Sequence, residues 1–418
     1  MKKSLYFLLF VLSFSVSPAQ TLSPARPEEA GMSSERLARI DNVVKEYIAK
    51  KWIPGAVILI ARNGKIVLHK AYGTNDDAKQ TALRKDDIFR IASQSKAITS
   101  TAIMILYEEG KLLLDDPLSK YIPEFKNPKV LVSFSDKDSS YTSEPAKSEI
   151  TIRHLLTHTS GIDYAVIGSK ELRAIYAKAK IPSGIGTPYD HLGEKIKVLG
   201  GMPLKHEPGD RFTYGLNTDV LGYVVEVVSG LNFNDFLKKR IFEPLGMNDT
   251  YFYLPKEKQN RLTTLYEEKE GKVTKVLTTK DRDPDYPNAP GVYYSGGAGL
   301  SATVEDYARF LQMFLNGGLY NGNRILGRKT IELMMTNQLK DNSGTFQFGL
   351  GFGLETPKND HLSPFSIGSF SWGGIFSTTY WADPKEKIVG LIFKQIYPTS
   401  HGDLDEKFKE LVYQAIVD

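Results

Sequence analysis

The sequence predicts an α+β fold, in which a central antiparallel sheet is flanked by the N- and C-terminal helices and joined to a mostly helical lobe. Three observations support this prediction. Two apolar runs surround Asn63-Gly64, a dipeptide typical of tight β-hairpins. Strand-like apolar runs return between residues 347 and 393. Between these regions, short helical patterns alternate with polar loops.

The predicted sheet takes its strands from both ends of the chain. Apolar residues at helical spacing over residues 33–51 predict an N-terminal helix. The hairpin then provides strands at residues 56–61 and 65–70. Near the other end, apolar runs predict further strands and a closing helix at residues 347–354, 366–372, 376–381, 388–393 and 404–416.

The middle of the chain is expected to form the helical lobe, at about residues 91–299. A helix is expected to begin near Ser93 and to end at Gly110. Long polar loops are expected at residues 133–148 and 256–290. Residues 21–418 then form one domain with a sheet lobe at about 30–90 and 300–418, and a cleft between the lobes is the expected place for a site.

The first twenty residues are typical of a secretory signal peptide. Lys2 and Lys3 precede an apolar run from Leu5 to Val16, which is followed by small residues around Ala19. The alternative is a retained membrane anchor, but the apolar run is short for a membrane span. We therefore expect cleavage, a secreted or periplasmic protein, and no stable membrane insertion afterwards.

Composition excludes several classes of function. The chain of 418 residues has a net charge of only +4 and no basic run, so nucleic acid is not an expected partner. It contains no cysteine, which excludes disulfides, thiol nucleophiles and thiolate zinc sites. Neither a G-x-S-x-G elbow nor a phosphate-binding P-loop motif is present.

Ser93 and Lys96 form the first candidate catalytic pair. They lie three residues apart at the expected start of a helix, a spacing that places both side chains on one face. A lysine amine can take the proton of a serine hydroxyl and so convert it into a nucleophile. The alternative is a helix cap followed by a solvated lysine.

Two further stretches could add to this chemistry. Tyr214 precedes an apolar helix, and a tyrosine hydroxyl near a lysine can relay a proton. Trp372-Gly373-Gly374-Ile375 precedes a strand, and its glycines would let a substrate approach exposed backbone N–H groups. The alternatives are ordinary packing for Tyr214 and a β-bulge beside a core tryptophan.

His154 and His158 are the candidate metal ligands, since residues four apart share a helix face. The glutamate of the H-E-x-x-H zinc motif is missing, however, because Leu155 follows His154. Structural histidines are the favoured interpretation. We expect neither a metal nor an organic cofactor.

The order of these stretches resembles the three motifs of the serine β-lactamase and penicillin-binding-protein superfamily. Ser93-x-x-Lys96, Tyr214 and Trp372-Gly373-Gly374 are most similar to the class C-like branch, and within it to the family VIII carboxylesterases. The resemblance covers about residues 30–415 and implies the β-lactamase/transpeptidase-like fold. Supporting stretches are residues 114–117, 150–161, 244–247 and 296–300.

The resemblance implies a role for each candidate. Ser93 would be the acylated nucleophile, Lys96 its general base and Tyr214 a proton shuttle. The backbone N–H groups of Ser93 and Ile375 would form the oxyanion hole. Trp372, Gly373 and Gly374 would line the substrate cleft.

Two departures from the β-lactamase pattern bear on the substrate. Leu216 occupies the asparagine position of the Tyr-x-Asn motif, with Asn217 one residue late, and Trp372 replaces the lysine of Lys-Thr-Gly. A cation at that position would hold a substrate carboxylate, so a tryptophan favours an uncharged ester. We therefore expect a secreted serine hydrolase that cleaves small carboxylic esters.

Two alternatives remain open at the level of the sequence. One is a weak class C-like β-lactamase or a D-amino-acid peptidase that acts on cell-wall peptides. The other is a penicillin-binding protein in which Ser93 is acylated without turnover. In each case the expected partner is a small-molecule ester or amide.

Overall fold

The computed structural model describes residues 21–280, 282–340 and 343–418. The predicted signal peptide, residues 1–20, lies outside the described residues. Within the described ranges, no helix combines the length and the apolar character that crossing a membrane requires.

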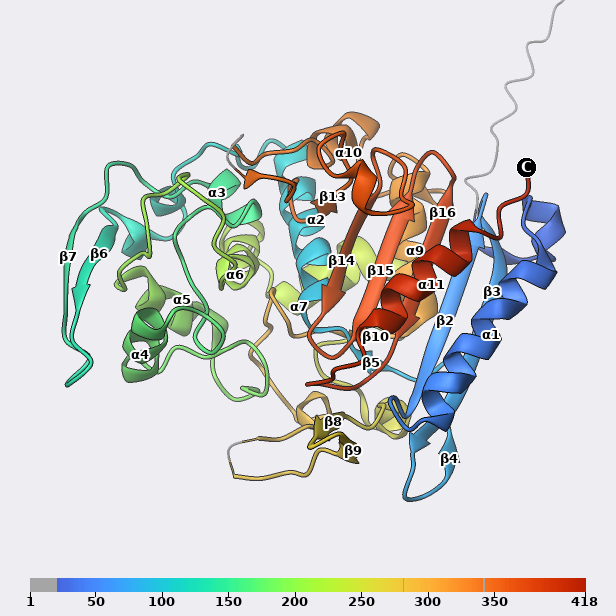
Figure 1. Ribbon diagram of the computed structural model, residues 1–418. Coiled ribbons are helices and arrows are strands. Elements are labelled where there is room, and N and C mark those ends of the chain that lie inside the picture. Colours follow the sequence, from blue (N-terminus) through green and yellow to red (C-terminus); the bar gives the residue numbers. More distant parts are fainter. Residues whose placement is uncertain (1–20, 281, 341–342) are drawn as a thin grey trace, which may run out of the picture.

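An eight-stranded sheet forms the centre of the described chain (Figure 1). Its pairs are antiparallel, except that β1 pairs with β3 in parallel. The predicted class, an α+β fold with a central sheet, is confirmed. In spatial order the strands are β1 (Ser23–Pro24), β3 (Lys65–Asp76), β2 (Gly55–Arg62), β16 (Ile388–Phe393), β15 (Thr378–Asp383), β14 (Phe370–Gly374) and β13 (Gly353–Leu354), with β4 (Thr81–Ala82) beside β3.

The central strand β2 is buried along its whole length because helices cover both faces of the sheet. Its successive residues alternate between two cores: Val57 and Leu59 face one, and Ile58 and Ile60 face the other. This is the two-residue period of a strand. The continuous apolar run in the sequence is therefore the signature of a doubly covered strand.

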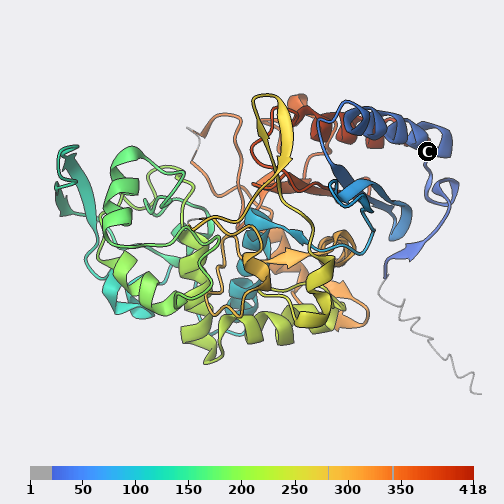
Figure 2. The same cartoon turned by 90° about the horizontal axis from the view of Figure 1, so that it is seen from below.

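Helices α1 (Ser34–Ala49) and α11 (Asp403–Tyr413) lie side by side on one face of the sheet (Figures 1 and 2). Helices α9 (Val304–Leu315) and α2 (Ser95–Glu108) belong to the core on the other face. Ser33 caps α1, because its hydroxyl accepts a hydrogen bond from the Arg36 N–H. Both predicted end helices are confirmed to within a few residues.

Residues 129–229, mostly green in Figure 1, lie beside α2 and extend away from the sheet to the left. Helix α6 (Asn217–Ser229) makes the main contact with α2. The remaining helices are α3 (Ile152–Leu156), α4 (Lys170–Lys178), α5 (Leu192–Gly200), α7 (Phe233–Leu237), α8 (Glu243–Leu245) and α10 (Arg328–Met334). Short strand pairs are β5 (Phe89–Arg90) with β10 (Ser301–Ala302), β6 (Lys129–Phe134) with β7 (Tyr141–Pro145), β8 (Tyr266–Lys269) with β9 (Lys272–Lys275), and β11 (Leu319–Tyr320) with β12 (Asn323–Arg324).

Three local predictions were wrong. Of the strand predicted at residues 347–354, only Gly353–Leu354 pairs with the sheet, because Gly351 has a φ of +99° and turns the chain. The loop predicted at residues 256–290 contains strands β8 and β9, and the loop predicted at residues 133–148 contains strand β7 of the β6–β7 hairpin. Both faces of this hairpin are largely exposed to solvent. Its sequence is therefore polar and lacks the apolar alternation that would predict strands.

Candidate active site

Ser93 lies in a tight turn between strand β5 and helix α2. The turn begins at Ala92, which is buried and has a left-handed φ of +43°, a conformation that costs energy for a residue other than glycine. A 3₁₀ turn at Ala92–Gln94 then leads into α2. The turn leaves Ser93 on the wall of a cavity while its neighbours are buried.

Lys96 lies one turn later, and its ammonium group is almost completely buried. The Nζ atom donates to Ser93 Oγ at 3.2 Å, to the Tyr164 hydroxyl at 2.8 Å and to the Gly297 carbonyl at 2.7 Å. These bonds use all three donors of an ammonium group. The spacing argument for Ser93 and Lys96 is thus met by a direct hydrogen bond.

The surroundings of Lys96 favour its charged form. Burial by itself lowers the pKa of Lys96, but interactions with Tyr164 and Tyr214 outweigh it and raise the pKa above its ordinary value. The Nζ atom also lies 4.6 Å from the centroid of the Tyr214 ring, a cation–π distance. The Nζ atom of Lys96 thus lies between the Tyr164 hydroxyl, which accepts its hydrogen bond, and the ring of Tyr214.

Tyr214 and Trp372 are in direct contact at the same site. The indole Nε1–H donates to the Tyr214 hydroxyl at 3.3 Å, and the two ring centroids are 5.7 Å apart. Ser93, Lys96, Tyr214 and Trp372, which span 280 positions of the sequence, are thus neighbours in space. Their catalytic roles stay predictions.

Tyr164 is the residue that the sequence reasoning missed. Its hydroxyl accepts from Lys96, its ring lies 5.4 Å from that of Tyr214, and burial raises its pKa. Tyr164 lies three residues after residues 150–161, a stretch that supports the family resemblance. This closeness was the only signal in the sequence that could have indicated a place at the site. Nothing in local spacing connects residues that are 68 positions apart.

Strand β14 brings the third motif against the turn that carries Ser93. A Cβ atom at Gly374 would lie 2.4 Å from the Ile91 carbonyl oxygen, so only glycine allows this approach. Ile375 follows directly and lines the same cavity as Ser93, together with Trp372 and Gly373. The predicted oxyanion residues, Ser93 and Ile375, therefore line one cavity, and their role stays a prediction.

Two of the stretches that support the family resemblance, residues 296–300 and 150–161, make hydrogen bonds that stabilise the structure around the site. The carbonyl of Gly297 binds Lys96 and that of Gly296 binds the Thr99 hydroxyl. Asn217 donates to His158 Nδ1 at 2.9 Å and accepts from Ser160 at 2.5 Å. Asn217 is thus buried in a structural network and does not line the cavity.

The two candidate metal ligands have separate partners. His154 Nδ1 accepts from the Thr151 N–H at the start of α3, whereas His158 Nδ1 binds Asn217. Burial lowers the pKa of both histidines. Across residues 21–280, 282–340 and 343–418 there is no group of three His, Cys, Asp or Glu side chains arranged to hold a metal ion.

A buried carboxylate lies behind Lys96. Asp219 on α6 has no hydrogen-bond partner at good geometry for either oxygen, but the Ser295 hydroxyl, the Gly297 N–H and Lys96 lie close to it. Burial raises its pKa to about 6, and these neighbours partly offset the rise. Gly297 therefore lies between Asp219 and Lys96 and contacts both.

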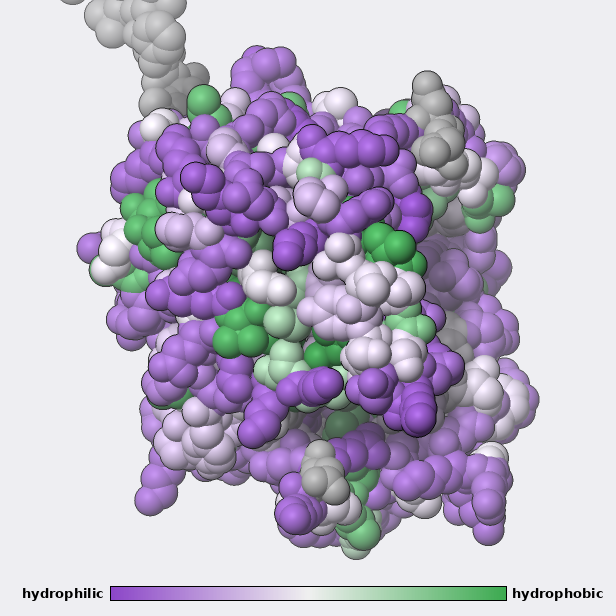
Figure 3. All heavy atoms as spheres, turned by 90° about the vertical axis from the view of Figure 1, so that its left-hand side faces the viewer, coloured by the Kyte–Doolittle hydropathy of each residue, from purple (hydrophilic) through white to green (hydrophobic). Residues whose placement is uncertain are grey.

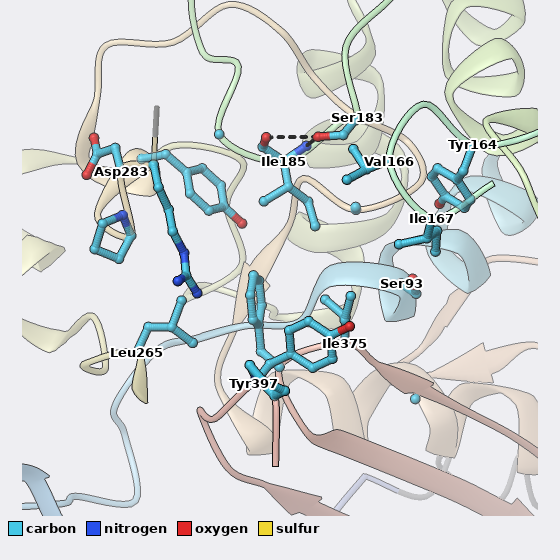
Figure 4. A pocket seen from close by; sticks show the side chains of 18 of the residues that line it. Ser93, Tyr164, Val166, Ile167, Ser183, Ile185, Leu265, Asp283, Ile375 and Tyr397 are labelled. Atoms are coloured by element: carbon cyan, nitrogen blue, oxygen red, sulfur yellow. Dashed lines mark hydrogen bonds between the residues drawn. The ribbon is translucent and has the colours of Figure 1, made fainter. Parts of the chain in front are cut away.

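A cavity of about 990 Å³ opens beside Ser93. Figure 4 shows Ser93 at one end and Leu265 and Asp283 at the other, with Ile185 on one side and Ile375 and Tyr397 opposite. The far wall is fixed by Arg90, a fully buried guanidinium that donates to the carbonyls of Thr263 and Pro284, each at 2.6 Å. Figure 3 shows apolar side chains grouped around a hollowed part of this side of the molecule.

Comparison with known proteins now decides the family. The family described as Beta-lactamase matches residues 40–414. The chain belongs to this family. Membership places it among the serine hydrolases of the β-lactamase superfamily, as the motif resemblance implied.

The chain is similar to several known proteins over nearly its whole length. It is 32% identical to protein Rv1367c of Mycobacterium tuberculosis over 375 residues, 85% of this chain and 89% of that protein. It is 29% identical to esterase EstB of Burkholderia gladioli over 396 residues, 90% and 95% of the two chains. Among solved structures it resembles EstCE1, described as a hydrolase with promiscuous acyltransferase activity, with 27% identity, a TM-score of 0.78 and coverage of 91% and 99%.

Proposed function

We propose that this protein hydrolyses carboxylic esters through a covalent acyl-enzyme on Ser93. The observation that carries the proposal is the direct contact of Lys96 with Ser93 at the edge of a large apolar cavity. The similarity to EstB and EstCE1 supports ester substrates. The proposal uses no metal and no organic cofactor.

The reaction begins with attack of Ser93 Oγ on the ester carbonyl carbon. Lys96 first releases one proton to water in the cavity, and the neutral amine then takes the proton of Ser93 as its Oγ bonds to the carbonyl carbon. The tetrahedral intermediate then loses the alcohol, which leaves with a proton relayed through Tyr214. Water attacks the Ser93 ester in the second half, which releases the acid and restores the Ser93 hydroxyl.

The backbone N–H groups of Ser93 and Ile375 are the proposed donors to the developing oxyanion. Donors on a rigid backbone stabilise the transition state without reorganisation, and loss of one such donor typically costs about 10²–10³ in rate. The strained turn at Ala92 and the close approach of Gly374 to Ile91 support this arrangement. Both features hold backbone in a fixed position beside the nucleophile.

Trp372 favours esters over β-lactams and peptides that carry a carboxylate. Its indole packs on Tyr214 and Phe348 where a β-lactamase has a lysine. A weak β-lactamase or D-amino-acid peptidase activity is the second candidate, supported by the shared family. A penicillin-binding protein without turnover is the third.

We also propose that the protein is secreted or periplasmic. This proposal rests on the signal-like residues 1–20 of the sequence. Comparison of the N-terminal sequence of the protein in the cell envelope with that of the full chain tests it. Recovery of uncleaved chain in the cytoplasm would contradict it.

Intact-protein mass spectrometry combined with steady-state assays tests the mechanism. The mature protein should turn over p-nitrophenyl butyrate, with nitrocefin cleaved slowly or not at all. Ser93→Ala should abolish ester turnover, and Lys96→Ala should reduce it nearly as far, because an unassisted hydroxyl is a poor nucleophile. Both variants should keep the wild-type circular dichroism spectrum.

Ser148→Ala is the matched control, since this exposed serine lies outside the cavity, and its activity should equal that of the wild type. Wild-type activity in Ser93→Ala would contradict the mechanism. A persistent nitrocefin adduct without ester turnover would instead identify a penicillin-binding protein.

A further inference from the structure

The cavity beside Ser93 is much larger than a short ester requires. Its volume of about 990 Å³ is near the upper end of the range for sites that enclose drug-sized ligands. An acetyl group bound to Ser93 would leave most of this space to water. The size of the cavity therefore carries information about the substrate beyond the presence of an ester bond.

The walls of the cavity are mainly apolar from the nucleophile to the far end. Ala92, Leu265, Val276 and Phe376 form a buried cluster, against which Ile375 and Ile185 pack. This cluster begins at the residue before Ser93 and at the proposed oxyanion residue. An apolar group attached to the ester would therefore meet apolar surface directly beyond the reacting atoms.

Apolar side chains also remain exposed where the cavity opens. Val166 is 56% exposed, Ile167 is 55% exposed and Tyr397 is 41% exposed, and all three line the cavity. Exposed apolar surface grouped around a concave site marks a place where apolar ligands bind. A bound hydrocarbon would cover these side chains and remove their surface from water.

The charged groups of the cavity do not favour an anionic ligand. Arg282 donates to Glu267 at 2.6 Å, and Lys269 also contacts Glu267. Asp283 adds a negative charge to the same end of the lining. The cation of Arg282 is therefore already neutralised by its neighbours, which favours a neutral substrate.

We infer that the substrates are neutral esters that carry a large apolar group, such as a hydrocarbon chain of eight or more carbons, bound along the cavity wall that contains Ile185 and Phe376. This inference rests on the proposed ester hydrolysis and specifies its substrate class. The apolar group can belong to the acid or to the alcohol part of the ester, because the cavity borders the reacting serine directly. Each methylene that becomes buried in the transition state should raise kcat/KM by up to about fourfold.

The test measures kcat/KM of the mature protein for two series of esters, each below its critical micelle concentration. One series lengthens the acid part from p-nitrophenyl acetate to p-nitrophenyl octanoate, and the other lengthens the alcohol part from ethyl acetate to octyl acetate. We expect kcat/KM to rise at least fiftyfold with length in one of the two series. The series that shows the rise identifies the part of the substrate that occupies the cavity.

Ile185→Trp provides the structural control of this test, because it fills the cavity away from Ser93. The ratio of kcat/KM between the longest and the shortest ester of the responsive series should fall at least tenfold. Ile367→Trp is the matched substitution at an exposed isoleucine outside the cavity, and it should leave this ratio unchanged. Val166→Asp at the rim should also lower the ratio, and its exposure makes misfolding a poor explanation.

The outcomes separate the two proposals. Turnover of the short esters with no gain in either series would overturn the preference for large apolar groups and leave ester hydrolysis intact. An unchanged ratio in both Ile185→Trp and Val166→Asp would overturn the assignment of this cavity. Absence of turnover for every ester would contradict ester hydrolysis itself.

Discussion

At the scale of single residues, the site depends on how the protons of Lys96 are held. The ammonium group has three acceptors, and one of them, Tyr164, has no counterpart in the sequence motifs. Lys96 therefore belongs to a cluster of hydroxyl groups and does not act as an isolated amine. Removal of any one partner should change how easily the cluster accepts the proton of Ser93.

Tyr164→Phe tests this dependence. Loss of the hydroxyl removes an acceptor of Lys96 and one route for its proton, so kcat/KM for p-nitrophenyl butyrate should fall roughly 10–100-fold, within the range of acid–base contributions. Tyr189→Phe, at a 71% exposed tyrosine outside the cavity lining, should have no effect. Equal activities of the two variants would show that Tyr164 only fills space.

Trp372→Lys tests the choice between neutral and anionic substrates. A cation at this position should attract a substrate carboxylate, while the lost packing on Tyr214 and Phe348 should slow neutral esters. The ratio of kcat/KM for p-nitrophenyl hemisuccinate to that for p-nitrophenyl butyrate should rise at least tenfold. Trp372→Leu removes the ring without adding charge, and a similar rise in that variant would contradict the electrostatic explanation.

At the scale of elements, the position of β14 against the turn that carries Ser93 is set by one glycine. In Gly374→Ala the new Cβ atom would lie 2.4 Å from both the Ile91 carbonyl oxygen and Thr378 Oγ1, so β14 must move away from the turn. Ester turnover should fall at least 100-fold, because the donors on the two elements separate. The measurement is kcat/KM together with the thermal unfolding midpoint.

Gly402→Ala is the control for this substitution, since a Cβ atom at Gly402 would meet nothing within 4 Å. Its activity should equal that of the wild type. Wild-type turnover in Gly374→Ala would show that the close approach of β14 has no catalytic consequence.

At the scale of the whole molecule, the two ends of the chain build one sheet and the middle completes the site. β2 pairs with β16 in six consecutive positions, and the Ser33 N–H donates to the Ala415 carbonyl at 2.8 Å. The cavity takes its lining from residues between Ser93 and Pro398. The site therefore depends on the folding of both ends and of the middle of the described chain.

The buried carboxylate of Asp219 makes global stability depend on pH. Its pKa is raised to about 6, so the folded state holds this proton more tightly than the unfolded state. This contribution to stability is complete below about pH 4 and is lost as pH rises through 6, by roughly 3 kcal/mol on the linkage relation. The stability of the wild type relative to Asp219→Asn should therefore decline between pH 4 and pH 7.

Urea unfolding of both proteins across this pH range measures the difference. Ser148→Ala, at an exposed side chain without an ionisable group, should differ from the wild type by a constant amount across this range. A constant difference for Asp219→Asn as well would show that this carboxyl titrates normally in the folded protein.

The sequence by itself determined the features that depend on neighbours along the chain. Three-residue spacing on a helix fixes the contact of Ser93 with Lys96, Asn63-Gly64 takes the positive φ values of a tight turn, and two-residue alternation marks β2. The order of the motifs likewise indicated the family. In each case the physical cause acts within a few residues, so the pattern is visible without a structure.

Only the tertiary structure decided which distant groups meet. Tyr164 and Gly297 reach Lys96 from 68 and 201 residues away, and the packing of separate loops against α2, which no local pattern encodes, places them there. The strand predicted at residues 347–354 failed for the same reason, since a turn at Gly351 replaces its pairing. The size of the cavity also depends on how separate loops pack against one another. This size is the observation that favours large apolar esters as substrates.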